Sequence, residues 1–252
     1  MIEKIEITEK TNYEKGGFKI QVLFPGKNLG NKDTGLGTIG RIDHANLSAE
    51  TLVPMHPHKD DEILTYLRRG KIKHKDSEGI VKVISNKKLM MMNAGEIFHH
   101  EELCLEDGEG LQIFIRPEEK GLKTNIQFHD LPSIYSSNTW RLIAGQCKEA
   151  PLHIRSKTSI YDIRLEIGKE IISPEMQEKN STFLFYVFDG DVVINKNTVL
   201  KKGESAIIKE EKINCKATQT TDIVLFVTDE NSTYFDDGMY SGNKSKVRQD
   251  FG

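Results

Sequence analysis

The chain has few cysteines and no long apolar run, and each shortage excludes a class of protein. Its three cysteines, Cys104, Cys147 and Cys215, are widely spaced and form no CxxC pair, which excludes a disulfide framework and a thiolate metal site. No apolar stretch approaches the length of a membrane span, and the segment from Met1 to Glu6 lacks the apolar core of a signal peptide. We therefore expect a cytoplasmic protein without membrane contact.

Excess positive charge and helical periodicity are also missing. The formal net charge is −3, which gives no reason to expect direct binding of nucleic acid. Long amphipathic helix patterns are absent, whereas 7 prolines and 20 glycines are spread along the chain. Short segments rich in β-branched and aromatic residues lie between these turn residues, at 63–67, 79–84, 111–115, 183–188 and 223–227. This pattern predicts an all-β barrel or sandwich.

Two histidines in the run Met55–Glu62 are the first sign of chemistry. His56 and His58 are two residues apart, so on an extended segment both side chains point to one face and can bind one metal ion together. Two histidines around a proline can also decorate a surface turn. Glu62 falls on the same face if the strand is regular, where it could orient an imidazole N–H.

A second cluster, Phe98-His99-His100-Glu101-Glu102, can complete the coordination sphere. Strand alternation places an imidazole and a carboxylate on one face, either as His100 with Glu102 or as His99 with Glu101. Periodicity alone does not choose between these registers. Either one yields three histidines and one carboxylate, a set that leaves positions open for water or substrate on a metal that favours higher coordination.

A weak internal repeat predicts two related units. Residues 53–70 can be laid on residues 173–190 without a gap, and Asn93–Glu96 can be laid on Lys201–Glu204. Chance resemblance between β-hairpins is the alternative explanation. Taken as a repeat, it predicts two small barrels, 1–130 and 131–252, joined within the polar stretch 129–138. In this alignment His56 falls on Met176, His58 on Glu178 and His100 on Ile208, so the metal site belongs to the first barrel alone.

The first half resembles a known family. The run from His56 to Tyr66 that ends at Gly70, the segment His74–Gly79, and Ala94-Gly95 followed by His100–Glu102 resemble, in order, motifs of the pirin family in the cupin superfamily. The resemblance is dense from about Gly37 to Pro117. Two positions depart from the pattern: Ile97 stands where glycine is common, and Arg68-Arg69 replaces an apolar-acidic pair. A one-residue slip at Ile97 would select His99 and Glu101.

The resemblance implies a bicupin, two tandem double-stranded β-helix barrels of the jelly-roll type, with one metal in the N-terminal barrel. The implied ligands are His56, His58, His100 and Glu102. Iron is the implied divalent metal, with Zn, Mn, Ni, Co and Cu as alternatives. The second barrel, without histidine ligands, is implied to be degenerate.

The resemblance leaves three functions open. Some pirin-like proteins resemble flavonol 2,3-dioxygenases, which open the heterocycle of quercetin with O2, and here Glu102 and Glu62 are the candidate catalytic residues for a small aromatic or flavonol-like substrate. Other pirins are associated with transcription factors, which implies an iron-binding, redox-sensing regulator that acts through a protein partner. A relative that keeps the histidines but has lost the metal is the third alternative.

Overall fold

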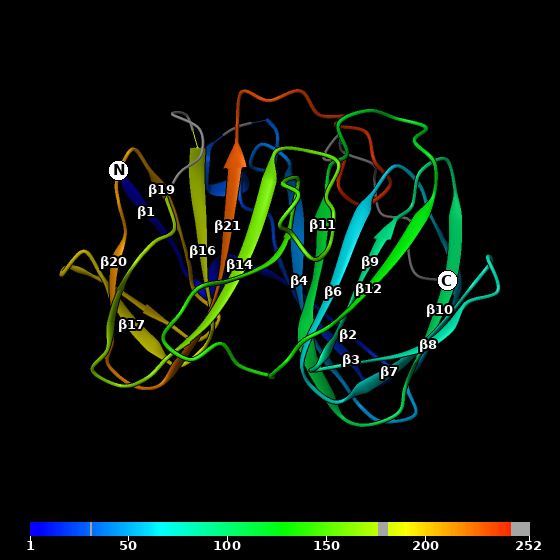
Figure 1. The fold of residues 1–252 in the computed structure, drawn as a ribbon, viewed down its shortest axis with the longest axis horizontal. Helices are drawn as coiled ribbons and strands as arrows, with labels where there is room; N and C mark the ends of the chain where they lie inside the picture. The colour runs from blue at the N-terminus through cyan, green and yellow to red at the C-terminus, as the bar shows by residue number, and fades with distance from the viewer. Residues whose placement is uncertain (31, 176–180, 243–252) are drawn as a thin grey trace.

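The computed structural model describes residues 1–30, 32–175 and 181–242 and is almost entirely β. Two barrels lie side by side, the first on the right and the second on the left of Figure 1. The helical elements assigned among the described residues are single turns, η1 (Ile7–Glu9) and η2 (Lys27–Leu29). Within these residues, no helix has the length and apolar character needed to span a membrane. The predicted all-β, two-barrel architecture is confirmed.

The first barrel is one continuous, curled sheet of 11 strands. In spatial order these are β2 (Thr11–Lys15), β3 (Phe18–Leu23), β4 (Ile39–Leu47), β11 (Gly108–Ile115), β6 (Glu62–Arg69), β9 (Lys88–Asn93), β8 (Val81–Ser85), β7 (Lys71–Asp76), β10 (Phe98–Cys104) and β5 (Leu52–His58), with β12 (Asn125–Asp130) also paired to β9. Every pairing in it is antiparallel, which permits the short hairpin connections that the glycines and polar turns supply.

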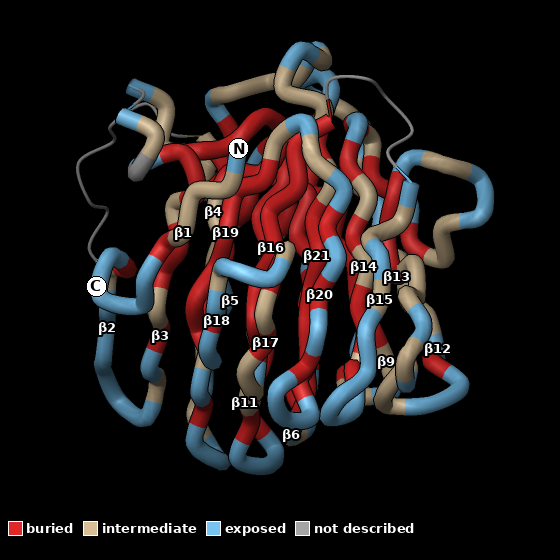
Figure 2. The backbone as a smooth tube through the Cα atoms, turned by 90° about the vertical axis from the view of Figure 1, so that its left-hand side faces the viewer, coloured by how far each residue is buried: buried red, intermediate tan, exposed pale blue. Residues whose placement is uncertain are grey.

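The second barrel consists of two sheets. A six-stranded sheet contains β1 (Ile2–Ile5), β19 (Ser205–Lys209), β16 (Ser181–Asp189), β21 (Thr221–Asp229), β14 (Thr158–Leu165) and β13 (Arg141–Gly145). A four-stranded sheet contains β15 (Glu170–Ile172), β20 (Asn214–Ala217), β17 (Asp191–Ile194) and β18 (Thr198–Lys201). The buried central strands of this barrel form the core seen in Figure 2.

The pairing pattern of the first barrel recurs in the second. The chain of pairs β4–β11–β6–β9 matches β14–β21–β16–β19, and β5–β10–β7–β8 matches β15–β20–β17–β18. Gly70 and Gly190 end equivalent strands with nearly the same left-handed φ, 84° and 86°. At both positions a Cβ would lie 2.5–2.6 Å from a backbone oxygen, so only glycine fits. The predicted repeat is therefore real over residues 62–70 and 182–190.

The alignment of His100 with Ile208 was wrong. Ile208 lies opposite Phe183 on β16, and the equivalent place in the first barrel is Met92, which lies opposite Ile63 on β6. The Gly-Glu pair that guided the alignment belongs to different turns in the two barrels. Gly203 connects β18 to β19, whereas Gly95 follows β9 and precedes β10.

Strand pairing gives the correct equivalents of the site residues. Glu102 lies opposite His74, and Cys215 lies opposite Ile194 in the same pair of strands of the second barrel. The position two residues before Cys215, equivalent to His100, is Ile213. The segment aligned with His56 and His58, which includes Met176 and Glu178, lies outside the described residues.

Two segments of the described chain, β1 and the segment around Tyr240, contact the barrel formed mainly by the other half of the sequence. Strand β1 pairs with β19 of the second barrel. At the other end, the carboxylate of Asp61 accepts hydrogen bonds from the backbone N–H groups of Tyr240 and Ser241, and Arg116 Nε donates to the carbonyl of Ser241 at 3.0 Å. The boundary between 1–130 and 131–252 stays a prediction, but each barrel also includes a segment from the other range.

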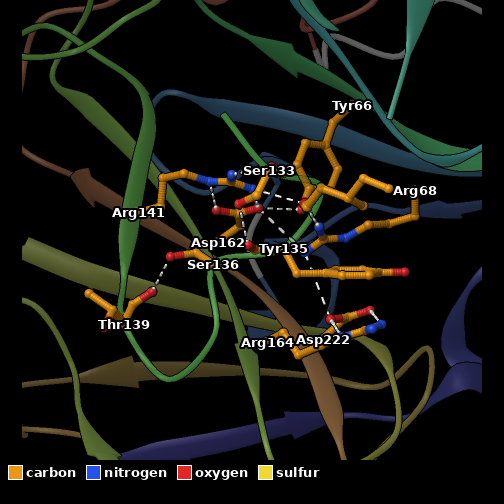
Figure 3. Close-up of polar contacts among 11 residues, drawn as sticks. Tyr66, Arg68, Ser133, Tyr135, Ser136, Thr139, Arg141, Asp162, Arg164 and Asp222 are labelled. Atoms are coloured by element: carbon orange, nitrogen blue, oxygen red, sulfur yellow. Dashed lines mark hydrogen bonds and ion pairs between the residues drawn. The ribbon is translucent and has the colours of Figure 1, made fainter. Parts of the chain in front are cut away.

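The barrels share an apolar core and a buried polar network. One hydrophobic cluster joins β6 and β11 residues to residues of β14, β16 and β21. Figure 3 shows the adjacent polar contacts, where the Tyr66 hydroxyl and the Arg141 guanidinium both donate to the buried carboxylate of Asp162. Arg68, one of the departures from the family pattern, lies 3.4 Å from Asp162 and donates to the carbonyl of Ile134. The basic residue thus connects the two barrels.

Candidate metal centre

Strands β5 and β10 bring three histidines to one point inside the first barrel. His56 and His58 alternate with Pro57 on β5, and His100 lies directly opposite His56 on β10. Nε2 of His58 is 3.1 Å from Nε2 of His56 and 3.0 Å from Nε2 of His100. His58 and His100 are buried, whereas His56 is half-buried and forms the more open edge of the cluster.

Contacts of Nδ1 orient two of these rings. His56 Nδ1 donates to the carbonyl of Pro54 at 2.9 Å, and His100 Nδ1 lies 3.4 Å from Nδ1 of His74. His58 Nδ1 is buried without a hydrogen-bond partner among the described residues, and a carboxylate oxygen of Asp61 lies 3.9 Å away. Contacts such as those of His56 and His100 fix the ring nitrogen that a histidine offers to a metal.

The local charge favours neutral imidazoles. Burial lowers the pKa of His100, and the neighbouring His58 and His56 lower it further. Burial also lowers the pKa of His56, with a smaller contribution from His58. A neutral ring with its proton on Nδ1 presents an Nε2 lone pair to the cluster, as the donation from His56 Nδ1 requires for that residue, and such a lone pair can bind a cation.

The three histidines fit a divalent metal ion. Nε2 of His58 lies 3.0–3.1 Å from Nε2 of each of the other two histidines. Two nitrogens at this spacing subtend roughly 90° at an ion about 2.1 Å from both, an angle closer to octahedral than to tetrahedral coordination. His56, His58 and His100 form one of the two groups of potential ligands among the described residues. The second group is His74, His100 and Glu102.

Strand β10 alternates strictly, so His100 and Glu102 face inward. His99 and Glu101 are half-buried on the other face, where Glu101 pairs with Lys75. The Glu102 carboxylate lies 3.9 Å from His100 Nδ1, and its Oε1 is buried without a hydrogen-bond partner among the described residues. Burial raises the pKa of Glu102 to about 7.

Glu62 lies away from the histidines, contrary to the expectation for a regular strand. Its carboxylate accepts hydrogen bonds from the side chain and backbone N–H of Arg155 and from Asn93. Strand β5 ends at His58, and Asp60 has a left-handed φ of 53°, which breaks the alternation before β6 begins. Asp61 is the acidic residue next to His58.

Three residues of the site were missed by sequence reasoning. His74 and Asp76 alternate with exposed lysines on β7, and that alternation was the available signal for their inward direction. The ring of Tyr240 lies 4.9 Å from the ring of His58, and Phe114 stacks on Tyr240 at 5.4 Å. No local sequence pattern predicted that Tyr240 lies at the site, because it is more than 100 residues away in sequence from the other site residues.

Comparison with known proteins identifies the family. Residues 34–115 match the Pirin family model, and residues 142–227 match the model of the quercetinase C-terminal cupin domain. A Zymomonas mobilis protein provisionally named quercetin 2,3-dioxygenase is 30% identical, over 72% of this chain and 78% of its own length. The chain belongs to the pirin family. Quercetin 2,3-dioxygenase of Escherichia coli K12 is 26% identical to this pirin, over 68% of this chain and 74% of the relative.

Solved structures support the same fold. The crystal structure of the bacterial pirin YhhW of Escherichia coli in complex with nickel(II) has a TM-score of 0.80 and 21% identity, and the match covers 91% of this pirin and 99% of YhhW. Quercetin 2,3-dioxygenase of Acinetobacter baumannii has a TM-score of 0.71 and 23% identity, with 88% and 84% covered. The sequence-based assignment to the pirins is confirmed by the family-model match and the Zymomonas mobilis relative.

Proposed function

We propose that this pirin is a metal-dependent flavonol 2,3-dioxygenase of the quercetinase type. The observation that carries the proposal is the convergence of the Nε2 atoms of His56, His58 and His100 inside the first barrel, with that of His58 3.0–3.1 Å from the other two. The named activity of the Escherichia coli relative supports the choice of reaction. The proposed ligands are these three histidines and, after rotation of its side chain from its place 3.9 Å from His100 Nδ1, Glu102. Iron is the proposed metal.

The protein supplies the ligands in the state that a divalent cation requires. Buried, neutral imidazoles offer lone pairs without having to lose a proton. When bound, the metal supplies Lewis acidity, which favours the ionised and more readily oxidised form of a flavonol. The Nδ1 contacts of His56 and His100 hold these two rings in place, so they need little reorganisation on loading.

Glu102 is the residue to which we assign the substrate proton. Its pKa of about 7 in the metal-free site allows it to accept a proton at neutral pH. Its Oε1 has no hydrogen-bond partner among the described residues, so it can take a proton without breaking a bond within the protein. Glu62, which is held by Arg155 and Asn93, is left out of the proposed chemistry.

Aromatic side chains lie beside the histidines. Phe114 and Tyr240 stack on each other beside His58, and the Arg41 guanidinium lies 4.8 Å from the Phe114 ring centroid and 5.3 Å from that of Tyr240. Arg41 is paired with Asp43, so a flavonol anion bound beside these rings would share the guanidinium with that carboxylate. The half-buried His56 marks the side from which we expect the substrate to approach.

The test is turnover of quercetin by protein of known metal content. Purified protein is loaded with iron, and in parallel with nickel, manganese, cobalt, copper and zinc, then mixed with quercetin in air while flavonol absorbance and carbon monoxide are followed. We expect metal-dependent loss of quercetin that His58→Ala abolishes and His99→Ala retains. Absence of bound metal under every loading condition would refute the proposal.

The same experiment distinguishes the regulatory alternative. Stoichiometric metal without turnover of any flavonol would favour an iron-binding, redox-sensing protein that acts through a protein partner. Binding of a partner that changes between the ferrous and ferric forms would then support that function directly.

A further inference from the structure

Behind His100, on the side away from His56 and His58, three buried side chains form a line. Asp76 Oδ2 lies 2.9 Å from His74 Nε2, and His74 Nδ1 lies 3.4 Å from His100 Nδ1. His74 and His100 are fully buried, and the carboxylate of Asp76 is shielded from solvent. The line ends at His100 Nε2, which faces the other two histidines.

The positions of the protons along this line follow from its chemistry. An ionised carboxylate only accepts, so the Asp76 contact requires the proton of a neutral His74 to be on Nε2. His74 Nδ1 then carries a lone pair and can accept the Nδ1 proton of His100. His100 is left with an unprotonated Nε2, the atom that must bind the metal. Glu102 is too far from His100 Nδ1, at 3.9 Å, to replace His74 as the acceptor.

We propose that Asp76 and His74 are positioning residues that hold His100 in the Nδ1-protonated tautomer and so direct its Nε2 lone pair to the metal. The inference rests on the proposed function in one respect, namely that His100 is a metal ligand. Mutation of a residue that contacts the non-ligating nitrogen of a ligand histidine typically lowers metal affinity by about 10- to 100-fold.

A role confined to turn formation does not explain His74. Asp76 does support the turn after β7, since its Oδ1 accepts the backbone N–H groups of Glu78 and Ile80, both at 2.9 Å. These bonds use the other carboxylate oxygen and do not need an imidazole. The turn is therefore held by Oδ1 of Asp76, whereas the contact with His74 uses Oδ2.

The second barrel shows that the fold itself does not need these polar groups. At the positions equivalent to His74, His100 and Glu102 it packs Ile194, Ile213 and Cys215, all fully buried. The three polar residues are thus absent together from a barrel of the same topology. Their joint presence in the first barrel points to one shared task at the metal centre.

The substitution Asp76→Asn separates the two roles of Asp76. In this variant the backbone N–H groups of Glu78 and Ile80 still need an acceptor. The amide oxygen of the new side chain must therefore face them, because an NH2 group cannot accept a hydrogen bond. The amide nitrogen must then face His74 Nε2 as a donor, which moves the His74 proton to Nδ1. His100 must in turn accept at Nδ1 and carry its proton on Nε2. The turn survives while the metal-binding tautomer is lost.

Two measurements test the proposal. Long-range 1H–15N NMR of metal-free protein with 15N-labelled histidine, assigned with a His100→Gln variant, reports which nitrogen of His100 carries the proton. We expect Nδ1 in the wild type and Nε2 in Asp76→Asn. Competition titration with a metal-sensing chelator should then show about 10- to 100-fold weaker iron or nickel binding. Asp107→Asn is the matched control, because Asp107 also accepts a backbone N–H, that of Ala49, in a turn of the same barrel.

A second variant guards against misfolding of the first. His74→Ile copies the residue that the second barrel accommodates at this position and removes the acceptor of the His100 proton. We expect a similar loss of metal affinity, and Asp76→Asn in the His74→Ile background should add little, because both act through one chain of contacts.

Several outcomes would contradict the proposed positioning of His100 by Asp76 and His74. These are an Nε2-protonated His100 in the wild type, unchanged affinity in both single variants, additive losses in the double variant, and two metal ions per chain with one between His74 and Glu102. If the wild type binds no metal, the proposed function fails by itself. The tautomer measurement in metal-free protein still tests whether Asp76 and His74 position His100.

Discussion

Tyr66 and Tyr186, which occupy equivalent positions in the two barrels, each extend a hydroxyl group into the opposite barrel. Tyr66 donates to Asp162 of the second barrel at 2.7 Å, and the Tyr186 hydroxyl lies 2.7 Å from Nδ1 of His44 in the first barrel. Lys10 Nζ also donates to the Tyr186 hydroxyl at 3.0 Å. Each of the two equivalent tyrosines thus forms a hydrogen bond across the interface. Tyr66 bonds to a carboxylate, whereas Tyr186 contacts the basic side chains of His44 and Lys10.

Removal of the Tyr66 hydroxyl should destabilise this interface. Tyr66→Phe deprives the buried Asp162 carboxylate of one donor, and a hydrogen bond to a charged group contributes about 1.5–3 kcal/mol. We expect a loss of that size in the free energy of unfolding, measured by urea titration. Tyr13→Phe, at an exposed tyrosine, is the control and should leave stability unchanged. An equal effect of the two variants would contradict the assigned role.

The direction of strand β10 predicts which histidine binds metal. His100→Ala removes an inward imidazole and should abolish stoichiometric metal binding, whereas His99→Ala removes an outward one and should leave binding unchanged. Both predictions are tested by the metal content of the two purified variants after loading with metal and desalting. Loss of metal in His99→Ala with retention in His100→Ala would establish the other register.

Glu62 should matter for stability and not for metal binding. Glu62→Ala leaves Arg155 and Asn93 without their carboxylate, and loss of a hydrogen bond to a charged group in this partly buried pair costs about 1.5–3 kcal/mol. Metal affinity should stay within about twofold of wild type, since Glu62 contacts none of the proposed ligands. Glu14→Ala is the control for an exposed pair, with Lys19, and should cost less than about 1 kcal/mol.

Lys10 gives the interface a pH dependence of defined sign. Burial lowers its pKa from 10.5 to about 7, and Glu204 opposes the shift only in part. Between about pH 7 and pH 10.5 the unfolded chain therefore binds a proton that the folded protein lacks, so this group adds stability as the pH rises through that window. The slope is at most about 1.4 kcal/mol per pH unit.

Urea titrations of wild type and Lys10→Met from pH 6.5 to 9.5 test this sign. The stability difference, wild type minus variant, should increase with pH. A difference that is constant or decreases over this range would show that Lys10 stays charged in the folded protein.

Local sequence patterns by themselves determined the strands and which residues share a face, but not which face of residues 98–104 points inward. Two-residue spacing on an extended chain suffices to place His56 beside His58 and His100 beside Glu102, because side-chain alternation is a property of the strand alone. Gly70 and Gly190 likewise revealed the duplication, since only glycine fits their left-handed, crowded turns.

Only the tertiary structure decided what depends on pairing between distant segments. A single left-handed residue, Asp60, moved Glu62 from the histidines to Arg155. Strand pairing across the barrel set His74 behind His100, and backbone bonds to Asp61 brought Tyr240 to the site from the other end of the chain. Alternation fixes the direction of a side chain within its own strand, but the partner it meets depends on register and loop path, which no local pattern encodes.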